Sequence, residues 1–491
     1  MRRVARGETG GGMNQRETLT PTRVLIVILL FTLSAAFAYR TLTQNRVDSD
    51  ALWHIRTGEY IVEHREIPAS DVFSWYGKQE SLPWLPHEWL FDIGIYGAWS
   101  LGGFRLIYLL TALIVGTVAP AVFALTRART DEFVTSLIAG VLAVLGCARF
   151  IAPRPQVLTF ALIVALALLL ERRRWFWAVA TMVLAVNLHG GMYPMYLLVF
   201  AFYCIPRKSI VLLAAGLAVL AQPLTLQLLP YPFFAFDSQM AWFQEAAPTV
   251  LARDWLYLPV LIGLVALTHR RRVPLQVAIA SLALIVLGLN GARHTAFTYL
   301  LVIPMIAPFI SAPSEPRPKD AEGAASETTP HGLSSTQRPG MPAWVDRALV
   351  VVLLASTLFV VSQSWSKHID YHAEYPKSAV DYVKEQGITR IWNDWGDGGY
   401  LIFRGVETLV DGRADPFSPF FRKDVTLARD FGITWYVGAD IRRFLDKYGV
   451  THMLIAKRAP LYQVVSQSRD FKLAYADDDY AVYEYSGVIS P

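Results

Sequence analysis

Long apolar segments recur along this chain and leave few folds open to it. Residues 105–125 and 273–291, for example, contain at most one charged side chain each. A helix of about 20 such residues crosses the ~30 Å hydrocarbon core of a bilayer. Of all 491 residues, 54% are hydrophobic and 17% are charged, whereas about a quarter of an average soluble protein is charged. The sequence therefore predicts a polytopic α-helical membrane protein.

We predict about 11 transmembrane helices from the apolar runs. Basic clusters fall on alternate connections, and placing all of them in the cytoplasm, as such loops favour, also places the N-terminus there. This topology requires residues 88–103, which are rich in aromatic side chains, to lie along the membrane surface rather than cross it. The predicted spans are near residues 23–40, 105–125, 133–150, 154–171, 174–189, 192–206, 208–226, 252–268, 273–291, 294–312 and 345–364.

The remaining segments divide the chain into further regions. Residues 1–22 form a cytoplasmic tail, residues 23–312 the membrane domain, and residues 41–104 its first outer loop. Segment 313–344 is rich in Pro, Ser and Glu, which is typical of a disordered linker, and the last span follows at 345–364. Residues 365–491 predict a small extracytoplasmic α/β domain with helices at 378–386 and 440–449, strands at 389–393 and 450–456, and a hairpin at 471–485.

The charge and the cysteine content give no sign of a nucleic-acid-binding protein or of a disulfide-stabilised one. The net charge of +5 comes mostly from loop Lys and Arg, so it reports topology and not a nucleic-acid partner. Cys147 and Cys204 both lie in apolar runs and predict no disulfide framework. We expect a multi-pass protein of the cell (plasma or inner) membrane, in contact with membrane lipids.

Asp48 and Asp50 stand at the exit of the first predicted span. In extended backbone both carboxylates point to the same side, where they could hold Mg²⁺ or Mn²⁺ or act as a base in group transfer. The alternative is structural, because an aspartate there could cap the helix that begins near Ala51. Asp50 could do both.

Other polar residues fall on the same predicted face. Glu245 lies in an aromatic-rich loop. Two outer turns are flanked by basic residues, namely Arg149, Arg154, Arg293 and His294. Charged residues at span ends can simply extend to the membrane surface. Arginines there could instead bind a lipid-linked phosphate through two parallel hydrogen bonds.

Four stretches together resemble a known family. They are DSDALWHIRTGEYIVEHREIPASD in the first outer loop, FQEAAP at Glu245, GARHTAFTYLLVIP at Arg293, and WNDWGDGGYLIFRGVETLVDGR in the C-terminal domain. With a horizontal helix before the second span, they resemble the GT-C class of membrane glycosyltransferases. The closest likeness is to the catalytic subunits of oligosaccharyltransferases, in a superfamily that includes dolichyl-phosphate-mannose-protein mannosyltransferases.

The resemblance implies roles for individual residues. An aspartate of the pair Asp48 and Asp50 would bind a divalent cation, Glu245 would meet the acceptor, and Arg293 would contact the donor phosphate. The family's C-terminal signature, which grips a peptide acceptor, falls on Trp392, Asp394 and Trp395, with Asp411 and Gly412 in its sequel. Asn393 replaces the signature's second tryptophan, and Trp395 replaces its tyrosine.

The second outer loop departs from the family. Its stretch CARFIAPRPQ has no carboxylate where the family has a second acidic motif. A metal-free enzyme is therefore the alternative to one that uses Mg²⁺ or Mn²⁺. We also count His54, His87 and Glu88 among the candidate acceptor-binding residues.

The leading hypothesis is an inverting glycosyltransferase. It would move a sugar or oligosaccharide from a polyprenyl phosphate or diphosphate carrier to a protein, lipid or glycan acceptor at the outer face. Asp50 or Asp48 would be the base, while Arg293, His294, Arg149 and Arg154 would bind the phosphate. One rival is a transporter or flippase of lipid-linked glycans, for which charges buried in mid-span are expected. The other is a non-catalytic scaffold of the same fold.

Overall fold

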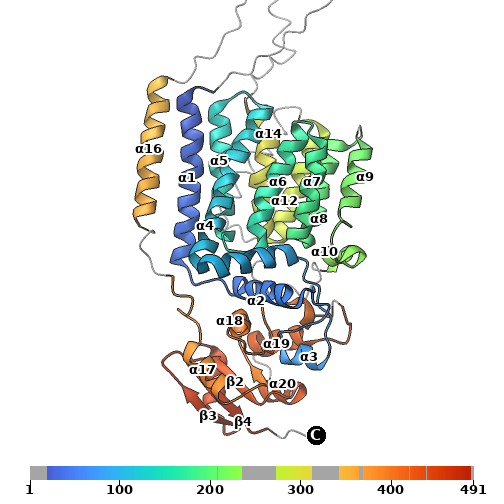
Figure 1. Ribbon diagram of the computed structural model, residues 1–491, viewed down its shortest axis with the longest axis vertical. Helices are drawn as coiled ribbons and strands as arrows, with labels where there is room; N and C mark the ends of the chain where they lie inside the picture. The colour runs from blue at the N-terminus through green and yellow to red at the C-terminus, as the bar shows by residue number, and fades with distance from the viewer. Residues whose placement is uncertain are drawn as a thin grey trace, which may run out of the picture.

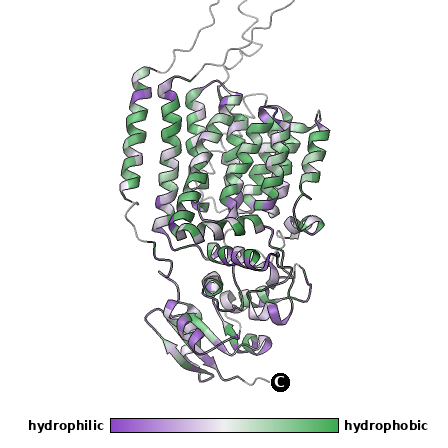
Figure 2. Cartoon of the chain, in the orientation of Figure 1, coloured by the Kyte–Doolittle hydropathy of each residue, from purple (hydrophilic) through white to green (hydrophobic). Residues whose placement is uncertain are grey.

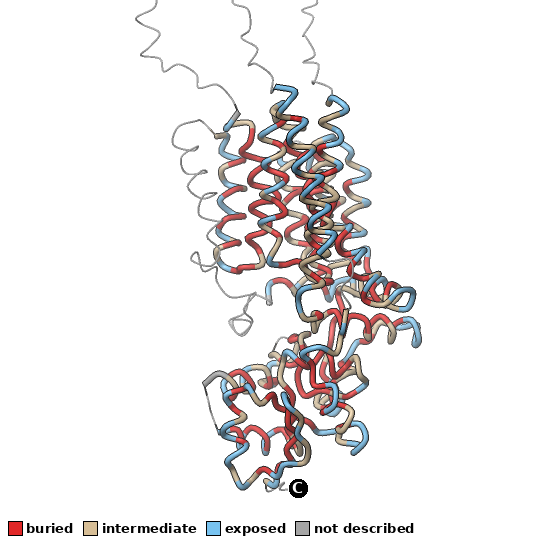
Figure 3. Tube along the Cα trace, turned by 90° about the vertical axis from the view of Figure 1, so that its left-hand side faces the viewer, coloured by how far each residue is buried: buried red, intermediate tan, exposed pale blue. Residues whose placement is uncertain are grey.

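The computed structural model describes residues 19–206, 208–234, 273–311, 342–363, 369–419, 421–437 and 440–487. Within these ranges the molecule has two parts (Figure 1): a bundle of helices and, beyond one end of it, a smaller part built from the first outer loop and the C-terminal residues. The bundle helices are mainly hydrophobic, whereas the smaller part is mixed (Figure 2). Buried residues continue from the bundle into the smaller part (Figure 3).

Five of the described helical segments are long and apolar enough to cross a membrane, fewer than the predicted 11. They are Pro21–Gln44, Trp89–Arg129, Phe133–Phe150, Ala292–Ile310 and Ala343–Ser362. The helices of the bundle are α1 (Pro21–Gln44), α4 (Trp89–Arg129), α5 (Phe133–Cys147), α6 (Pro155–Glu171), α7 (Trp175–Leu188), α8 (Tyr193–Cys204), α9 (Ser209–Ala218), α10 (Tyr231–Phe234), α12 (Leu275–Asn290), α13 (Thr295–Phe297), α14 (Ile303–Ser311) and α16 (Ala343–Ser362). A π-helical turn, Thr298–Val302, joins α13 to α14.

Five other predicted spans correspond to apolar helices of only 10–17 residues, from Pro155–Glu171 to Leu275–Asn290. At 1.5 Å per residue such helices measure about 15–26 Å, less than the ~30 Å hydrocarbon core. The apolar runs overestimate helix length because the turns within them are apolar too. Run 208–226, for instance, contains α9 and ends in turns. Predicted span 252–268 lies outside the described residues, as do residues 1–18 and 313–341.

Gly102 and Gly103 divide α4 into a short first part and a long second part. Neither has helical backbone angles, and φ of Gly103 is +58°, which glycine adopts without a steric penalty. The first part of α4 lies across the ends of the bundle helices and beside α2 (Figure 1). Residues 89–101 thus run across the direction of the bundle helices, and their course along a membrane surface stays a prediction.

The segment predicted to be the first outer loop, a name kept below for residues 41–104, contains α2 (Ser49–His64) and α3 (Trp75–Gln79). Asp48 caps α2, because its side chain accepts hydrogen bonds from the N–H groups of Asp50 and Ala51. Gly58 lets α2 pack closely on α4, since a Cβ there would overlap the backbone oxygen of Asp92. An aspartate of the pair therefore caps this helix, as the structural alternative expected, but the cap is Asp48 and not Asp50, because the helix begins at Ser49 and not near Ala51.

The C-terminal residues form a four-stranded sheet with helices around it. The strand order is β1 (Ile391–Trp392), β2 (His452–Ala456), β4 (Tyr480–Tyr485), β3 (Phe471–Ala476), with β1 parallel to β2 and the other pairs antiparallel. The helices are α17 (Lys377–Glu385), α18 (Gly398–Phe403), α19 (Leu427–Val437), α20 (Ile441–Tyr448) and α21 (Pro460–Gln467). The predicted strands, hairpin and two helices are confirmed, and α19 and α21 were not predicted from the sequence.

Glycines allow the C-terminal part to pack directly on the start of α2. A Cβ on Gly399 would overlap the carbonyl oxygen of Ser49, and one on Gly412 would overlap Oδ1 of Asp50. Both glycines belong to the stretch that resembles the family signature and its sequel. Because these glycines have no side chains, that stretch can pack directly against the acidic pair.

Two ion-pair groups join the same surfaces. Arg46 contacts Asp397 at 2.8 Å. Arg413 is buried and bonds Asp411 at 2.6 and 2.7 Å and Asp71 of the first outer loop at 2.7 Å. The buried guanidinium is therefore paired with carboxylates on both sides, and its charge is not left without a partner. The first outer loop and the C-terminal part therefore form one packed unit.

Candidate functional site

A cavity of about 420 Å³ lies where α2, the adjacent ends of the bundle helices and the C-terminal part meet. Its wall combines segments that are far apart in the sequence: the first outer loop, the turn before α6, the turn after α12 and the region around α18. Eight residues that the sequence analysis selected line it: Asp50, His54, His87, Glu88, Arg154, Arg293, His294 and Trp395. The structure thus brings together most of the predicted site.

One arginine bridges the acidic pair. Arg154 donates from Nε to Oδ1 of Asp48 at 2.9 Å and from Nη2 to Oδ2 at 2.8 Å. Its Nη1 lies 3.0 Å from Oδ2 of Asp50. Burial alone would raise the pKa of Asp48, but the charge and hydrogen bonds of Arg154 lower it. Asp48 is therefore an ionised, structural carboxylate, whereas Asp50 lies on the cavity wall.

The predicted divalent cation does not fit this arrangement. In the parts of the chain that the structure describes, no group of three or more His, Cys, Asp or Glu side chains could hold a metal ion. Each oxygen of Asp48 and Asp50 already has a donor or ion-pair partner. Arg154 contacts both oxygens of Asp48 and Oδ2 of Asp50, and Trp53 donates to Oδ1 of Asp50 at 3.2 Å. A guanidinium already lies between the two carboxylates, and it would repel Mg²⁺ or Mn²⁺.

His54 is held by a carboxylate that the sequence analysis missed. Its Nδ1 lies 2.5 Å from Oδ1 of Asp92 in α4, and both side chains are buried. Burial, and next the charge of Arg154, keeps the pKa of His54 well below its usual value. Asp92 fixes the ring, and the neutral imidazole lines the cavity. An acidic residue in an otherwise apolar helix was the available sequence signal for Asp92.

Glu88 lies between two histidines. Its carboxylate is 2.8 Å from Nδ1 of His87 and 4.0 Å from Nε2 of His189. Burial would lower the pKa of His87, yet Glu88 raises it, and His87 in turn lowers the pKa of Glu88 against its burial. Burial lowers the pKa of His189 to about 3. The cavity therefore contains an ion pair beside a neutral imidazole.

Arg293 lines the cavity beside His294. Its Nε is buried and makes no hydrogen bond to any described residue. A buried donor without a partner is costly, so this side of the cavity is suited to an anion. In this respect Arg293 differs from Arg154, whose contacts to Asp48 and Asp50 commit it to the acidic pair.

Asp415 and Tyr231 form a second contact that the sequence analysis missed. The Tyr231 hydroxyl donates to Oδ2 of Asp415 at 2.8 Å, and both residues line the cavity. Burial raises the pKa of Asp415 to about 6, with the charge of Glu88 also raising it while His87 and the Tyr231 hydroxyl lower it. The stretch DGRADP gives only a turn signal, so sequence alone does not place Asp415 here.

The remaining predicted residues lie elsewhere. Trp392 is 1% exposed and stacks on Phe431 in the domain core. Asp394 caps the turn before α18 by accepting from the N–H of Gly396 at 2.8 Å. Arg149 lines a smaller neighbouring cavity of about 170 Å³, together with Asp48 and Arg154. Glu245 lies outside the described residues.

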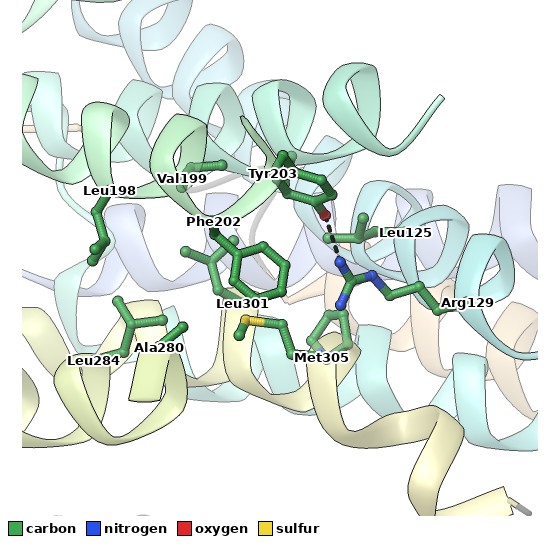
Figure 4. A pocket seen from close by; sticks show the side chains of 12 residues that line it. Leu125, Arg129, Leu198, Val199, Phe202, Tyr203, Ala280, Leu284, Leu301 and Met305 are labelled. Atoms are coloured by element: carbon green, nitrogen blue, oxygen red, sulfur yellow. Dashed lines mark hydrogen bonds between the residues drawn. The ribbon is translucent and has the colours of Figure 1, made fainter. Parts of the chain in front are cut away.

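A hollow near the far end of α4 does not resemble a substrate site. Arg129, at the end of α4, donates to the Tyr203 hydroxyl at 2.9 Å and to Glu171 at 2.8 Å. The surrounding side chains, such as Leu125 and Met305, are apolar (Figure 4). With about 20 Å³ of space, the hollow has room for little more than one water molecule.

Comparison with known proteins does not place the chain in a family. No protein-family model matches it, and a search of curated proteins finds no match. The function must therefore be inferred from the residues and their geometry.

The raised pKa of Asp415 predicts a pH-dependent stability. Since this carboxyl titrates near pH 6 when folded and near its ordinary value of 3.8 when unfolded, its contribution is present at low pH and is lost as the pH rises through 6. Asp415→Asn should therefore gain stability relative to the wild type as the pH rises from about 3.8 to about 6, by at most about 3 kcal/mol, with little further change above that range. Thermal melts at several pH values measure this, and parallel curves for the two proteins would contradict it.

Asp440 provides the matched control. Its exposed carboxylate pairs with Arg442, which lowers its pKa. Asp440→Asn should therefore show no relative gain as the pH rises.

Proposed function

We propose that the protein is a GT-C-type glycosyltransferase that uses a polyprenyl-phosphate-linked or -diphosphate-linked sugar donor. Its acceptor would bind at the outer face of the membrane. The observation that carries the proposal is a single cavity, at the end of an apolar helical bundle, that holds both a carboxylate and an arginine, Asp50 and Arg293. One buried nitrogen of this arginine has no hydrogen-bond partner among the residues that the structure describes. The likeness of the four sequence stretches supports it as an analogy of fold and motif.

The chemistry requires a proton acceptor and a stabiliser of the departing phosphate. The acceptor oxygen forms a bond to the anomeric carbon, and the bond from that carbon to the phosphate oxygen breaks. The acceptor's proton passes to the carboxylate of Asp50, which acts as general base. The phosphate leaves with the electron pair, and its charge is stabilised by Arg293. Asp48 cannot easily serve as the base, because it caps α2 and bonds Arg154 twice.

The rest of the cavity suits the two substrates. Phe297 and Met192 give the cavity apolar wall area, where the first prenyl units of the donor would lie. His54, Glu88 and Trp395 line the same cavity. We assign this polar and aromatic part to the acceptor. Trp392 and Asp394 then support the domain and do not touch the acceptor.

Binding of a carrier lipid tests the phosphate site. The probe is undecaprenyl phosphate added to the full-length protein in nanodiscs, with affinity measured by native mass spectrometry. We expect Arg293→Ala to weaken binding roughly 10- to 100-fold, the effect of losing a charge-assisted hydrogen bond. Arg105→Ala is the matched control, because Arg105 is exposed and does not line the cavity. Equal affinity of the wild type and Arg293→Ala would remove the phosphate-binding role.

Turnover distinguishes an enzyme from its rivals. Purified protein is incubated with a panel of polyprenyl-phosphate sugars, and release of the free carrier phosphate is measured. Release that depends on an acceptor supports a transferase. Movement of intact donor lipid across the bilayer without release would indicate a transporter, and lipid binding without either activity would indicate a scaffold.

A further inference from the structure

The acidic pair and Arg154 form a closed ionic unit. The guanidinium meets Asp48 through two parallel hydrogen bonds of 2.8 and 2.9 Å and reaches Asp50 at 3.0 Å. Only about a quarter of the Arg154 side chain is exposed, and less of each aspartate. Arg154 comes from the second outer turn and the aspartates from the first loop, so the unit joins two separate segments.

The other contacts of the pair leave no oxygen without a donor or ion-pair partner. Oδ1 of Asp48 also accepts from the N–H groups of Asp50 and Ala51, at 2.9 and 3.2 Å. Oδ1 of Asp50 accepts from the indole of Trp53. The planar, permanently charged guanidinium matches this geometry, which a point-like cation would not.

We infer that Arg154 is the resident cation of this acidic pair and takes the place that a divalent metal would occupy. It is a positioning residue: it neutralises Asp48 and orients Asp50 on the cavity wall. The role of Asp50 as a general base rests on the proposed function, whereas the identity of the cation between the two aspartates does not. The chain would then need no Mg²⁺ or Mn²⁺ at this pair.

Removing the guanidinium should create a metal site. Arg154→Met keeps the unbranched apolar stem but leaves two carboxylates 3.0 Å or less from the vacated nitrogens. Carboxylate oxygens are the ligands that Mg²⁺ and Mn²⁺ prefer. We expect the variant to bind one Mn²⁺ at least tenfold more tightly than the wild type, as measured by electron paramagnetic resonance of the full-length protein titrated with Mn²⁺.

Three further variants make the result specific. Arg154→Lys keeps a positive charge and should not gain Mn²⁺ binding. Arg154→Met combined with Asp48→Asn and Asp50→Asn should lose the gain. Arg56→Ala removes an arginine that pairs with Glu59 within α2, and it should behave as the wild type does. Thermal melts of every variant establish that it is folded.

Two outcomes overturn the inference. One is Mn²⁺ binding by the wild type that Asp48→Asn and Asp50→Asn abolish; the other is a folded Arg154→Met that binds no more Mn²⁺ than the wild type. If Arg154→Met does not fold, the wild-type titration decides alone, because a resident guanidinium predicts no Mn²⁺ at the pair. Since none of these measurements uses a sugar donor, the proposed transferase activity could fail while this inference stands, or the reverse.

Discussion

Asp50→Asn should lower sugar transfer by roughly 10²- to 10⁴-fold, the usual contribution of a general base. The amide cannot take the acceptor's proton, although it has nearly the shape of the carboxylate. Folding should be kept, because Arg154 keeps both bonds to Asp48. The single amide oxygen of the new side chain can accept from Arg154 or from Trp53, but not from both in the present geometry. The measurement is donor turnover by purified protein, alongside its melting temperature and its affinity for undecaprenyl phosphate.

Asp48→Asn separates the two aspartates. It leaves an oxygen that can still cap α2, because Asn and Asp cap equally well, but it breaks the two-bond ion pair with Arg154. Its main effect should therefore be a loss of stability of about 3 kcal/mol. Asp50→Asn should instead lose turnover while its melting temperature and lipid binding stay near those of the wild type. Full turnover in Asp50→Asn would exclude this residue as the base.

Sequence reasoning predicted much of the site because of one topological rule. If all connections rich in Lys and Arg lie on one side of the membrane, the connections that alternate with them must lie on the other side. This places Asp50, Arg154 and Arg293 at one end of the bundle. The structure confirms that they line one cavity. The strands of the C-terminal domain were also predictable, because their alternation and turn residues are local signals.

Pairing between distant residues could not be predicted in the same way. Arg154 was expected at the donor phosphate, yet it bonds the aspartates, because its partner depends on how two loops fold together. Asp92 and Asp415 belong to an apolar helix and a turn whose sequences give no sign of the residues that face them. Helix lengths were overestimated for a related reason, since hydropathy does not distinguish an apolar helix from the apolar turn that follows it.

The close approach of Gly399 to α2 was also invisible in the sequence, where the glycine signals only a turn. Gly399→Ala should separate the C-terminal part from the start of α2. Its Cβ would overlap the carbonyl oxygen of Ser49, and backbone on both sides cannot move aside as a flexible side chain does. Overpacking of this kind costs about 1–3 kcal/mol, and more where neither side can adjust. We expect a lower melting temperature and faster proteolysis of the C-terminal part.

Gly396→Ala tests whether the effect comes from this contact. Gly396 lies in the turn just before α18, only three residues from Gly399. The nearest atom to its Cβ would be Oδ1 of Asp394 at 3.5 Å, an ordinary van der Waals distance. It should therefore melt and resist protease as the wild type does. Because Ser49 adjoins both aspartates, the separation in Gly399→Ala should also disturb Asp50 and lower turnover under the proposed function. Equal melting and proteolysis of the two variants would show that the C-terminal part does not pack on α2 through Gly399.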